Sequence, residues 1–161
     1  MSLDLLKNLL KELGHVIQLP GLTPDEDGYC CLSFDDKITV HIQLDKDTQN
    51  LTFFCEVGKV EDNYKRQVYE KMLEANVFWL GTGGATLGVN SETLTATLGY
   101  QEPLQGIDFQ RFQQLLEGFV NTSEKWIDLI AELQRKNAPD SSTEKTDTDT
   151  SGSTDFQSIP V

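Results

Sequence analysis

The strongest constraint on the fold is a run of helical periodicity near the end of the chain. Apolar residues recur at three- and four-residue spacing over residues 109–133, which places them on one face of an α-helix. Asp108 precedes the run as a candidate N-cap. Gly118 interrupts it at a cost of about 1 kcal/mol relative to Ala, which favours close packing around this glycine. The apolar face consists of Phe109, Phe112, Leu115, Leu116, Phe119, Val120, Trp126, Ile127, Ile130 and Leu133.

Three β-strands precede this helix and offer it a surface to cover. They are predicted at residues 29–35, 37–44 and 50–57, where short polar connections make the neighbours antiparallel. The second strand alternates most clearly, because Ile38 and Ile42 face one way while His41 faces the other. The predicted sheet therefore has one apolar face and one wet face.

A helix, a glycine cluster and a β-hairpin lie between these strands and the long helix. Asp62 is a candidate N-cap, and Asn76, which tolerates a left-handed backbone, is the predicted helix end. Glycines gather over residues 81–84, and strands are predicted at residues 85–89 and 93–100. The apolar face of this helix consists of Tyr64, Val68, Tyr69, Met72 and Leu73.

An amphipathic, leucine-rich helix opens the chain over residues 2–14 and ends at Gly14. A helix this short is not stable alone and needs a docking surface. Together the elements predict an α+β fold in the order helix, three strands, helix, two strands, helix. We expect a twisted antiparallel sheet of about five strands packed on helices.

Length and charge limit the classes of function. A chain of 161 residues with 38% hydrophobic content suits one domain, which we expect over residues 1–136. Residues 137–161 hold ten Ser and Thr and five acidic residues, a composition that predicts a disordered acidic tail. The net charge of −13 argues against nucleic acid and anionic membranes as partners. We expect neither a signal peptide nor a membrane span.

Cysteine and histidine form no recognisable chemical site. Cys30, Cys31 and Cys55 make an odd count without CxxC spacing, so we expect buried free thiols in a reducing cytoplasm and no zinc site. His15 and His41 have no partner at catalytic or metal spacing, and solvated or hydrogen-bonded side chains are expected. We therefore expect no catalytic residue, no cofactor and no metal.

Two alternative interpretations invoke a bound ligand. The glycine cluster over residues 81–84 could belong to a small nucleotide-binding protein or enzyme, but it leaves a helix to enter a strand and lacks a following Lys-Ser/Thr. Asp45, Asp47 and Glu56 match positions of a calcium-binding loop, but predicted strands flank them instead of helices. Tight turns are the simpler interpretation of both. A structural adaptor is a third functional class.

The block from helix to hairpin also resembles a known family. The resemblance rests on residues 72–76 (MLEAN), residues 82–89 (TGGATLGV), Leu98 and residues 103–104 (PL), within a matching order of elements over roughly residues 1–135. It is to the class I type III secretion chaperones, the Tir chaperone (CesT) family. The resemblance implies a non-enzymatic, homodimeric chaperone in the bacterial cytoplasm, with a role in virulence. Such a chaperone binds the N-terminal region of secreted effectors, keeps it non-globular and secretion-competent, and has the secretion ATPase as a further candidate partner.

The resemblance also assigns candidate residues. It implies a dimer interface on the second helix and the strand after the glycine cluster, and cargo contacts on the first helix and the early strands. A binder of this kind needs apolar patches and open strand edges that accept an extended segment. The candidate interface residues are Tyr64, Val68, Met72, Gly83, Gly84, Leu87 and Gly88, and the candidate cargo residues are Leu6, Leu10, Phe34, Ile38 and Ile42.

Overall fold

The computed structural model describes residues 1–136, so the predicted tail lies outside the described residues. The described part has the predicted order of helix, three strands, helix, two strands and helix. The elements are α1 (Ser2–Val16), β1 (Tyr29–Phe34), β2 (Ile38–Leu44), β3 (Asn50–Lys59), α2 (Lys65–Asn76), β4 (Thr86–Asn90), β5 (Thr95–Pro103) and α3 (Phe109–Lys136), with two 3₁₀ turns, η1 (Asp62–Tyr64) and η2 (Val77–Trp79).

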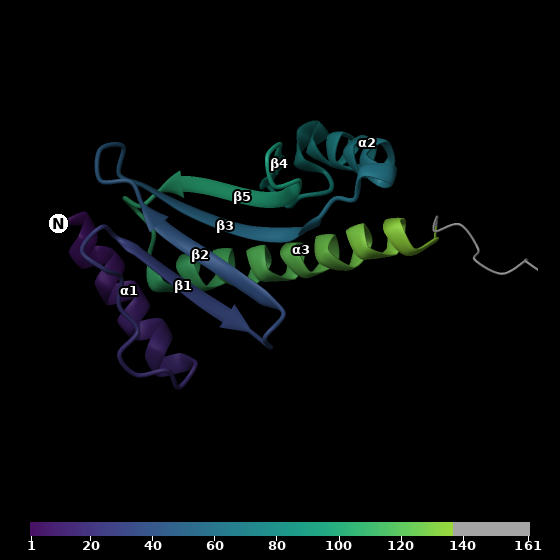
Figure 1. Ribbon diagram of the computed structural model, residues 1–161. Coiled ribbons are helices and arrows are strands. Elements are labelled where there is room, and N and C mark those ends of the chain that lie inside the picture. The colour runs from purple at the N-terminus through teal and green to yellow at the C-terminus, as the bar shows by residue number, and fades with distance from the viewer. Residues whose placement is uncertain (137–161) are drawn as a thin grey trace, which may run out of the picture.

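The five strands form one antiparallel sheet in the order β1-β2-β3-β5-β4, which confirms the predicted α+β fold. β1 and β4 are therefore the two edge strands (Figure 1). α3 runs along one face of the sheet and contacts β3 and β2, α1 packs beside α3, and α2 lies against β4 (Figure 1). The helices thus cover a single face and leave the other face open.

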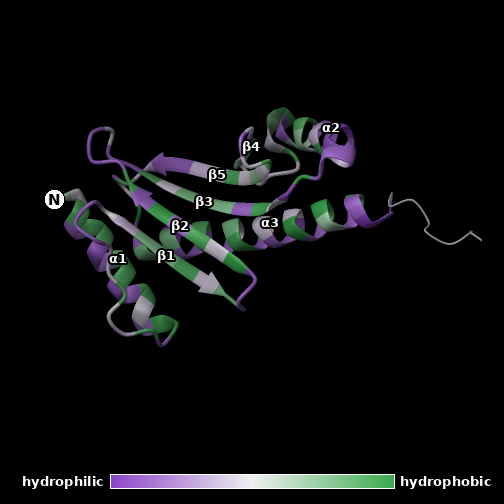
Figure 2. Cartoon of the chain, viewed as in Figure 1, coloured by the Kyte–Doolittle hydropathy of each residue, from purple (hydrophilic) through white to green (hydrophobic). Residues whose placement is uncertain are grey.

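The core lies between this covered face and the helices. Apolar and polar residues alternate along the strands and along the two longer helices, as Figure 2 shows, and the apolar ones meet in the interior. Phe53 of β3 contacts Phe112 and Phe119 of α3 at ring-centroid distances of 6.0 and 5.9 Å. Aromatic pairs at such distances add to the burial of apolar area, which is the main stabilising contribution.

Helix ends follow the predictions in part. Asp108 caps α3 as predicted, because its Oδ1 accepts the backbone N–H of Arg111 at 2.7 Å. The prediction for Asp62 is wrong, since this residue begins η1, forms no capping bond and pairs with Lys65, where α2 begins. α2 ends at Asn76 as predicted.

The packing around Gly118 differs from the prediction. A methyl group placed on Gly118 would have no atom within 4 Å other than its own helix turn. No other element packs closely on this part of α3, so the prediction of close packing is wrong. Among the helices of residues 1–136, none combines the length and apolar character that a membrane span requires.

Candidate functional site

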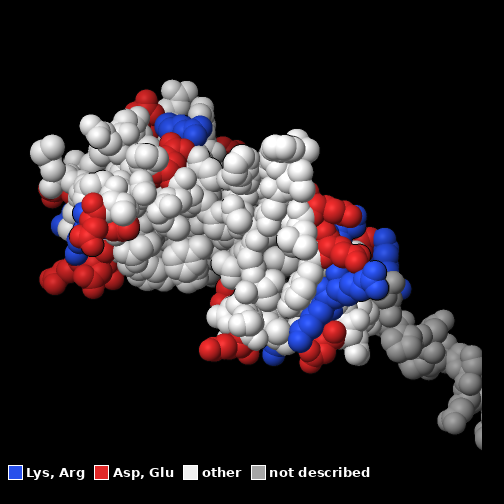
Figure 3. Space-filling model, turned by 90° about the horizontal axis from the view of Figure 1, so that it is seen from above, with Lys and Arg blue, Asp and Glu red and all other residues white. Residues whose placement is uncertain are grey.

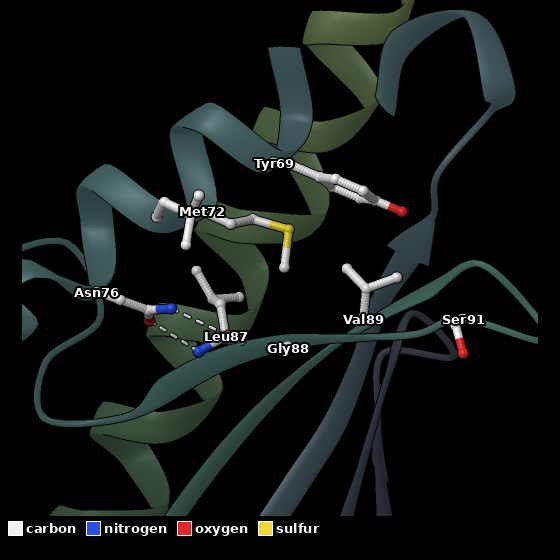
Figure 4. Close-up of a pocket in the computed structure, with 8 residues that line it drawn as sticks. Tyr69, Met72, Asn76, Leu87, Gly88, Val89 and Ser91 are labelled. Atoms are coloured by element: carbon white, nitrogen blue, oxygen red, sulfur yellow. Dashed lines mark hydrogen bonds between the residues drawn. The ribbon is translucent and has the colours of Figure 1, made fainter. Parts of the chain in front are cut away.

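A cleft of about 340 Å³ lies between α2 and the edge strand β4 (Figure 4). Tyr69 and Met72 project from α2 toward β4, and Leu87 and Val89 point back toward them. Met72 and Leu87 form the buried floor, whereas Leu73 on the rim has 67% of its surface exposed. The cleft is thus an apolar depression beside an exposed leucine.

Asn76 ties the two walls of this cleft together. Its side-chain amide donates a hydrogen bond to the Leu87 carbonyl at 3.0 Å, and its Oδ1 accepts the Leu87 backbone N–H at 2.9 Å (Figure 4). An asparagine amide can donate through its NH₂ group and accept through its oxygen at the same time, as a neighbouring strand would at this position. The end of α2 is therefore fixed to β4, and Leu87 has its outer backbone groups satisfied.

An exposed apolar turn follows α2 directly. Val77, Phe78, Trp79 and Leu80 are consecutive and all exposed, with 82% of Phe78 and 83% of Leu80 accessible. Phe78 and Trp79 have left-handed backbones, with φ of 50° and 56°. Such a conformation costs a bulky residue on the order of 1–3 kcal/mol, so the surrounding structure must hold it in place. Four apolar side chains in one turn form a contact surface suited to a partner.

The predicted interface residues divide into two groups. Tyr64, Val68, Met72 and Leu87 are buried in the chain's own core, because the inner face of α2 packs on the sheet. Met72 and Leu87 nevertheless line the α2/β4 cleft, and the assignment of all four residues to a dimer interface stays a prediction. Gly83, Gly84 and Gly88 are exposed, and around Gly88 no atom lies within 4 Å of an added methyl group.

The residues that sequence reasoning missed here are exposed neighbours of the predicted ones. Leu73 belongs to the predicted apolar face of α2 but faces solvent, and no role was predicted for the turn from Val77 to Leu80. Four consecutive apolar residues before a glycine cluster are the signal that could have identified this turn.

The uncovered face of the sheet forms a second candidate surface. Its centre is a stack in which His41 lies 4.6 Å from Phe54 and 5.9 Å from Tyr29 between ring centroids. The Tyr29 hydroxyl and His41 Nδ1 share a hydrogen bond of 2.7 Å, as expected for a hydrogen-bonded histidine. Other residues on this face are Cys31, Ser33, Thr39, Gln43, Thr52, Glu56, Thr86, Gly88, Thr97, Gly99 and Gln101.

The open face is almost free of charge in a strongly acidic protein. Two charged residues lie on it, Glu56 and, at the end of β3, Lys59. Seen from above, charged side chains also gather toward the two ends of the molecule, with a broad uncharged band between them (Figure 3). At one end of the open face, Trp79 borders a shallow hollow with Thr52, Thr86 and Gly99. An extended, neutral segment could lie here without desolvating fixed charges.

The predicted cargo residues are mostly interior. Leu6, Leu10 and Ile42 have no exposed surface, and Ile38 is 4% exposed. The buried leucines of α1 belong to the core cluster and this helix packs beside α3, so much of its wide apolar stripe is core, and the assignment of these four residues to cargo binding stays a prediction. Phe34, at the end of the edge strand β1, remains half-buried.

The two stretches that suggested a bound ligand both form ordinary turns in the structure. Gly83 and Gly84 have positive φ, and a methyl group on Gly81 would lie 2.6 Å from Ala75 Cβ, so the cluster is a tight turn between η2 and β4. Asp45 Oδ1 accepts the backbone N–H groups of Asp47 and Thr48, and hydrogen bonding to Thr48 is the main cause of its lowered pKa. Within residues 1–136, no three His, Cys, Asp or Glu side chains gather as metal ligands.

The thiols differ in environment. Cys30 and Cys55 are buried and free as predicted, and burial raises the pKa of Cys30 to about 12. Cys31 is exposed on the open face, which corrects its prediction. A buried protonated thiol is a poor nucleophile, so Cys31 is the accessible thiol of the three.

Comparison with known proteins gives a consistent picture. Residues 8–127 match the model of the Tir chaperone protein (CesT) family. A search of the curated proteins gave no match. Among solved structures, the chain is similar to one in the ExsC–ExsE complex, with a TM-score of 0.69 and 21% identity over 80% of this chain and 95% of that one.

Two further structures share the fold. A chain of the HopA1–SchA chaperone–effector complex has a TM-score of 0.64 and 16% identity, over 80% of this chain and 97% of that one. The Yersinia pestis type III secretion chaperone SycH, solved with a stable fragment of YscM2, has a TM-score of 0.58 and 18% identity, over 75% of this chain and 98% of that one. At these identities the similarity shows the fold.

Proposed function

Because the chain belongs to the Tir chaperone protein (CesT) family, we propose that it is a type III secretion chaperone that binds the N-terminal region of secreted effectors. It acts as a homodimer in the bacterial cytoplasm, keeps the bound segment non-globular and delivers it to the secretion apparatus. Residues 1–136 are the chaperone domain, and residues 137–161 are an appended acidic tail. The structural relatives solved as complexes, one of them the HopA1–SchA chaperone–effector complex, support this proposal.

The observation that carries the proposal is the uncovered sheet face with its free edge. A non-globular segment exposes both backbone groups and apolar side chains, and an open strand edge can pair with the first while an uncharged surface accepts the second. β1 offers that edge, and the Tyr29–His41–Phe54 stack lies beside it on the open face. An enzyme pocket that is closed on all sides has no free strand edge with which an extended segment could pair. The surface described here is wide and shallow instead.

The second surface supports dimerisation. The α2/β4 cleft, the exposed Leu73 and the turn from Val77 to Leu80 adjoin one another at the opposite edge of the sheet. An isologous dimer places the same patch of both subunits in contact, so a protruding apolar residue and an apolar depression on one patch can complement each other. Cargo at the β1 edge and the partner subunit at the β4 edge then approach each other only near Trp79, which borders both surfaces.

A charge placed on the open face tests the cargo surface. Partners are first recovered by pull-down from the native bacterium and identified by mass spectrometry, and the N-terminal segment of the best partner is then titrated by calorimetry. Phe54→Glu should weaken binding at least about tenfold, which corresponds to about 1.4 kcal/mol, because the carboxylate would be desolvated under the segment.

The matched control is Gln113→Glu on the exposed side of α3, which adds the same charge away from the sheet. It should bind like the unmodified protein. Equal binding by Phe54→Glu, with an unchanged melting temperature, would show that cargo binds elsewhere. Recovery of no secreted protein would contradict the proposed function itself.

A further inference from the structure

A small basic cleft on α1 is set apart from the rest of this acidic chain. Lys7, Lys11 and His15 are spaced by four residues, so they line one side of the helix. With the loop from Pro20 to Thr23 they enclose a cleft of about 340 Å³. Among the described residues, Lys7 and Lys11 form no ion pair, although most cations of residues 1–136 do.

The acidic residues nearest to this row do not neutralise it. Asp4 is paired with the N-terminal ammonium group at 3.2 Å, and Glu12 does not line the cleft. Lys7 and Lys11 are both exposed and separated by one helical turn. Two like charges at this spacing repel each other, which an anionic occupant would relieve.

An exposed apolar group continues the basic row. Val16, Ile17 and Leu19 follow His15 and are all exposed, with Ile17 and Leu19 beyond the end of α1. In chain order the surface is therefore basic first and apolar second. A segment that runs in the same direction as α1 would match both parts if its acidic residues preceded its apolar ones.

The chain contains one such segment in its own sequence. Residues 137–161 carry five acidic residues and one Lys, and Asp155 is followed by Phe156, Ile159 and Val161. We propose that this segment binds the α1 surface, with its acidic residues at Lys7 and Lys11 and its apolar residues at Val16, Ile17 and Leu19. This self-contact goes beyond the proposed chaperone function and needs no effector.

The length of the segment is sufficient. α3 has 28 residues and is therefore about 42 Å long. Its last residue, Lys136, lies at the end of the molecule away from α1 (Figure 1). An extended chain covers about 3.3 Å per residue, so about 13 residues span the length of α3. Asp155 and the apolar residues after it are then left to contact α1.

Paramagnetic broadening measures the contact directly in the full-length chain. A nitroxide label is attached to Ser158→Cys in a chain that also carries Cys31→Ser, since the buried Cys30 and Cys55 react poorly. The label should reduce the intensities of the backbone amide NMR signals from Lys11 to Leu19 by at least half. Raising NaCl to about 0.5 M shortens electrostatic range to a few ångströms and should restore those signals in part, because only the charged half of the contact is screened.

Charge reversal provides the matched comparison. Lys7→Glu combined with Lys11→Glu should abolish the broadening, and both sites are exposed, so the melting temperature should not change. Lys59→Glu combined with Lys125→Glu reverses two other exposed lysines and should leave it intact. Broadening that is absent from α1, or that only the second pair abolishes, would overturn the proposal.

Discussion

Gly118 lies in the middle of α3 with open space where a side chain would be. Because glycine is costly inside a helix, Gly118→Ala should raise the free energy of unfolding by about 0.5–1 kcal/mol. Urea denaturation followed by circular dichroism would measure this change. Gly81→Ala is the opposing control, since its methyl group would lie 2.6 Å from Ala75 Cβ and should destabilise the protein. A destabilised Gly118→Ala would mean that a partner chain packs on α3 here.

Single residues show where sequence reasoning stops. The alternation of Ile38 and Ile42 and the cap at Asp108 depend on neighbours within a few residues, and both were predicted correctly. Burial of Leu6 and Leu10 depends on how α1 docks beside α3 in the folded chain. Periodicity identifies an apolar face, but it does not say whether that face meets the chain's own core or another molecule.

At the scale of elements, α2 and β4 behave as one unit because Asn76 joins them by two hydrogen bonds. Leu73 is exposed on this unit and is not needed for the fold. If the unit forms the dimer interface, Leu73→Glu should raise the dimer dissociation constant at least about 100-fold, or about 2.7 kcal/mol, by burying a charge. Light scattering over a dilution series measures the shift.

Gln113→Glu again serves as the control for that series, and it should remain dimeric. A dimer unchanged by Leu73→Glu would move the interface away from α2, and a monomer at all concentrations in the unmodified chain would reject dimerisation.

The order and type of the elements were predictable, and their pairing was only partly so. The β4–β5 hairpin follows from a short polar connection. The pairing of β5 with β3 joins residues that are far apart in the sequence, from Asn50↔Pro103 to Lys59↔Thr95, and no local pattern reports it. The left-handed backbone of Phe78 and Trp79 was missed for a related reason, since aromatic residues rarely adopt it.

For the whole molecule, the described residues 1–136 already form a continuous buried core cluster. A chain that ends after Lys136 should therefore unfold cooperatively. Its melting temperature should lie within about 2 °C of that of the full chain, because the acidic segment has little apolar area to offset its ordering entropy. Scanning calorimetry in about 0.5 M NaCl, where the α1 contact is screened, makes this comparison. A larger fall in the melting temperature would mean that part of the domain lies beyond residue 136.

The positions of the two edge strands have a consequence for the length of cargo. In a dimer joined at α2 and β4, the β1 edges lie at the two far ends. Strands are spaced by about 4.8 Å, so each sheet spans about 19 Å and the two β1 edges are on the order of 40 Å apart. A single extended segment would need at least about 12 residues between its two contacts to reach both. The dimer would then discriminate cargo by length. A long unfolded segment would contact both β1 edges, and a short one would contact only one of them.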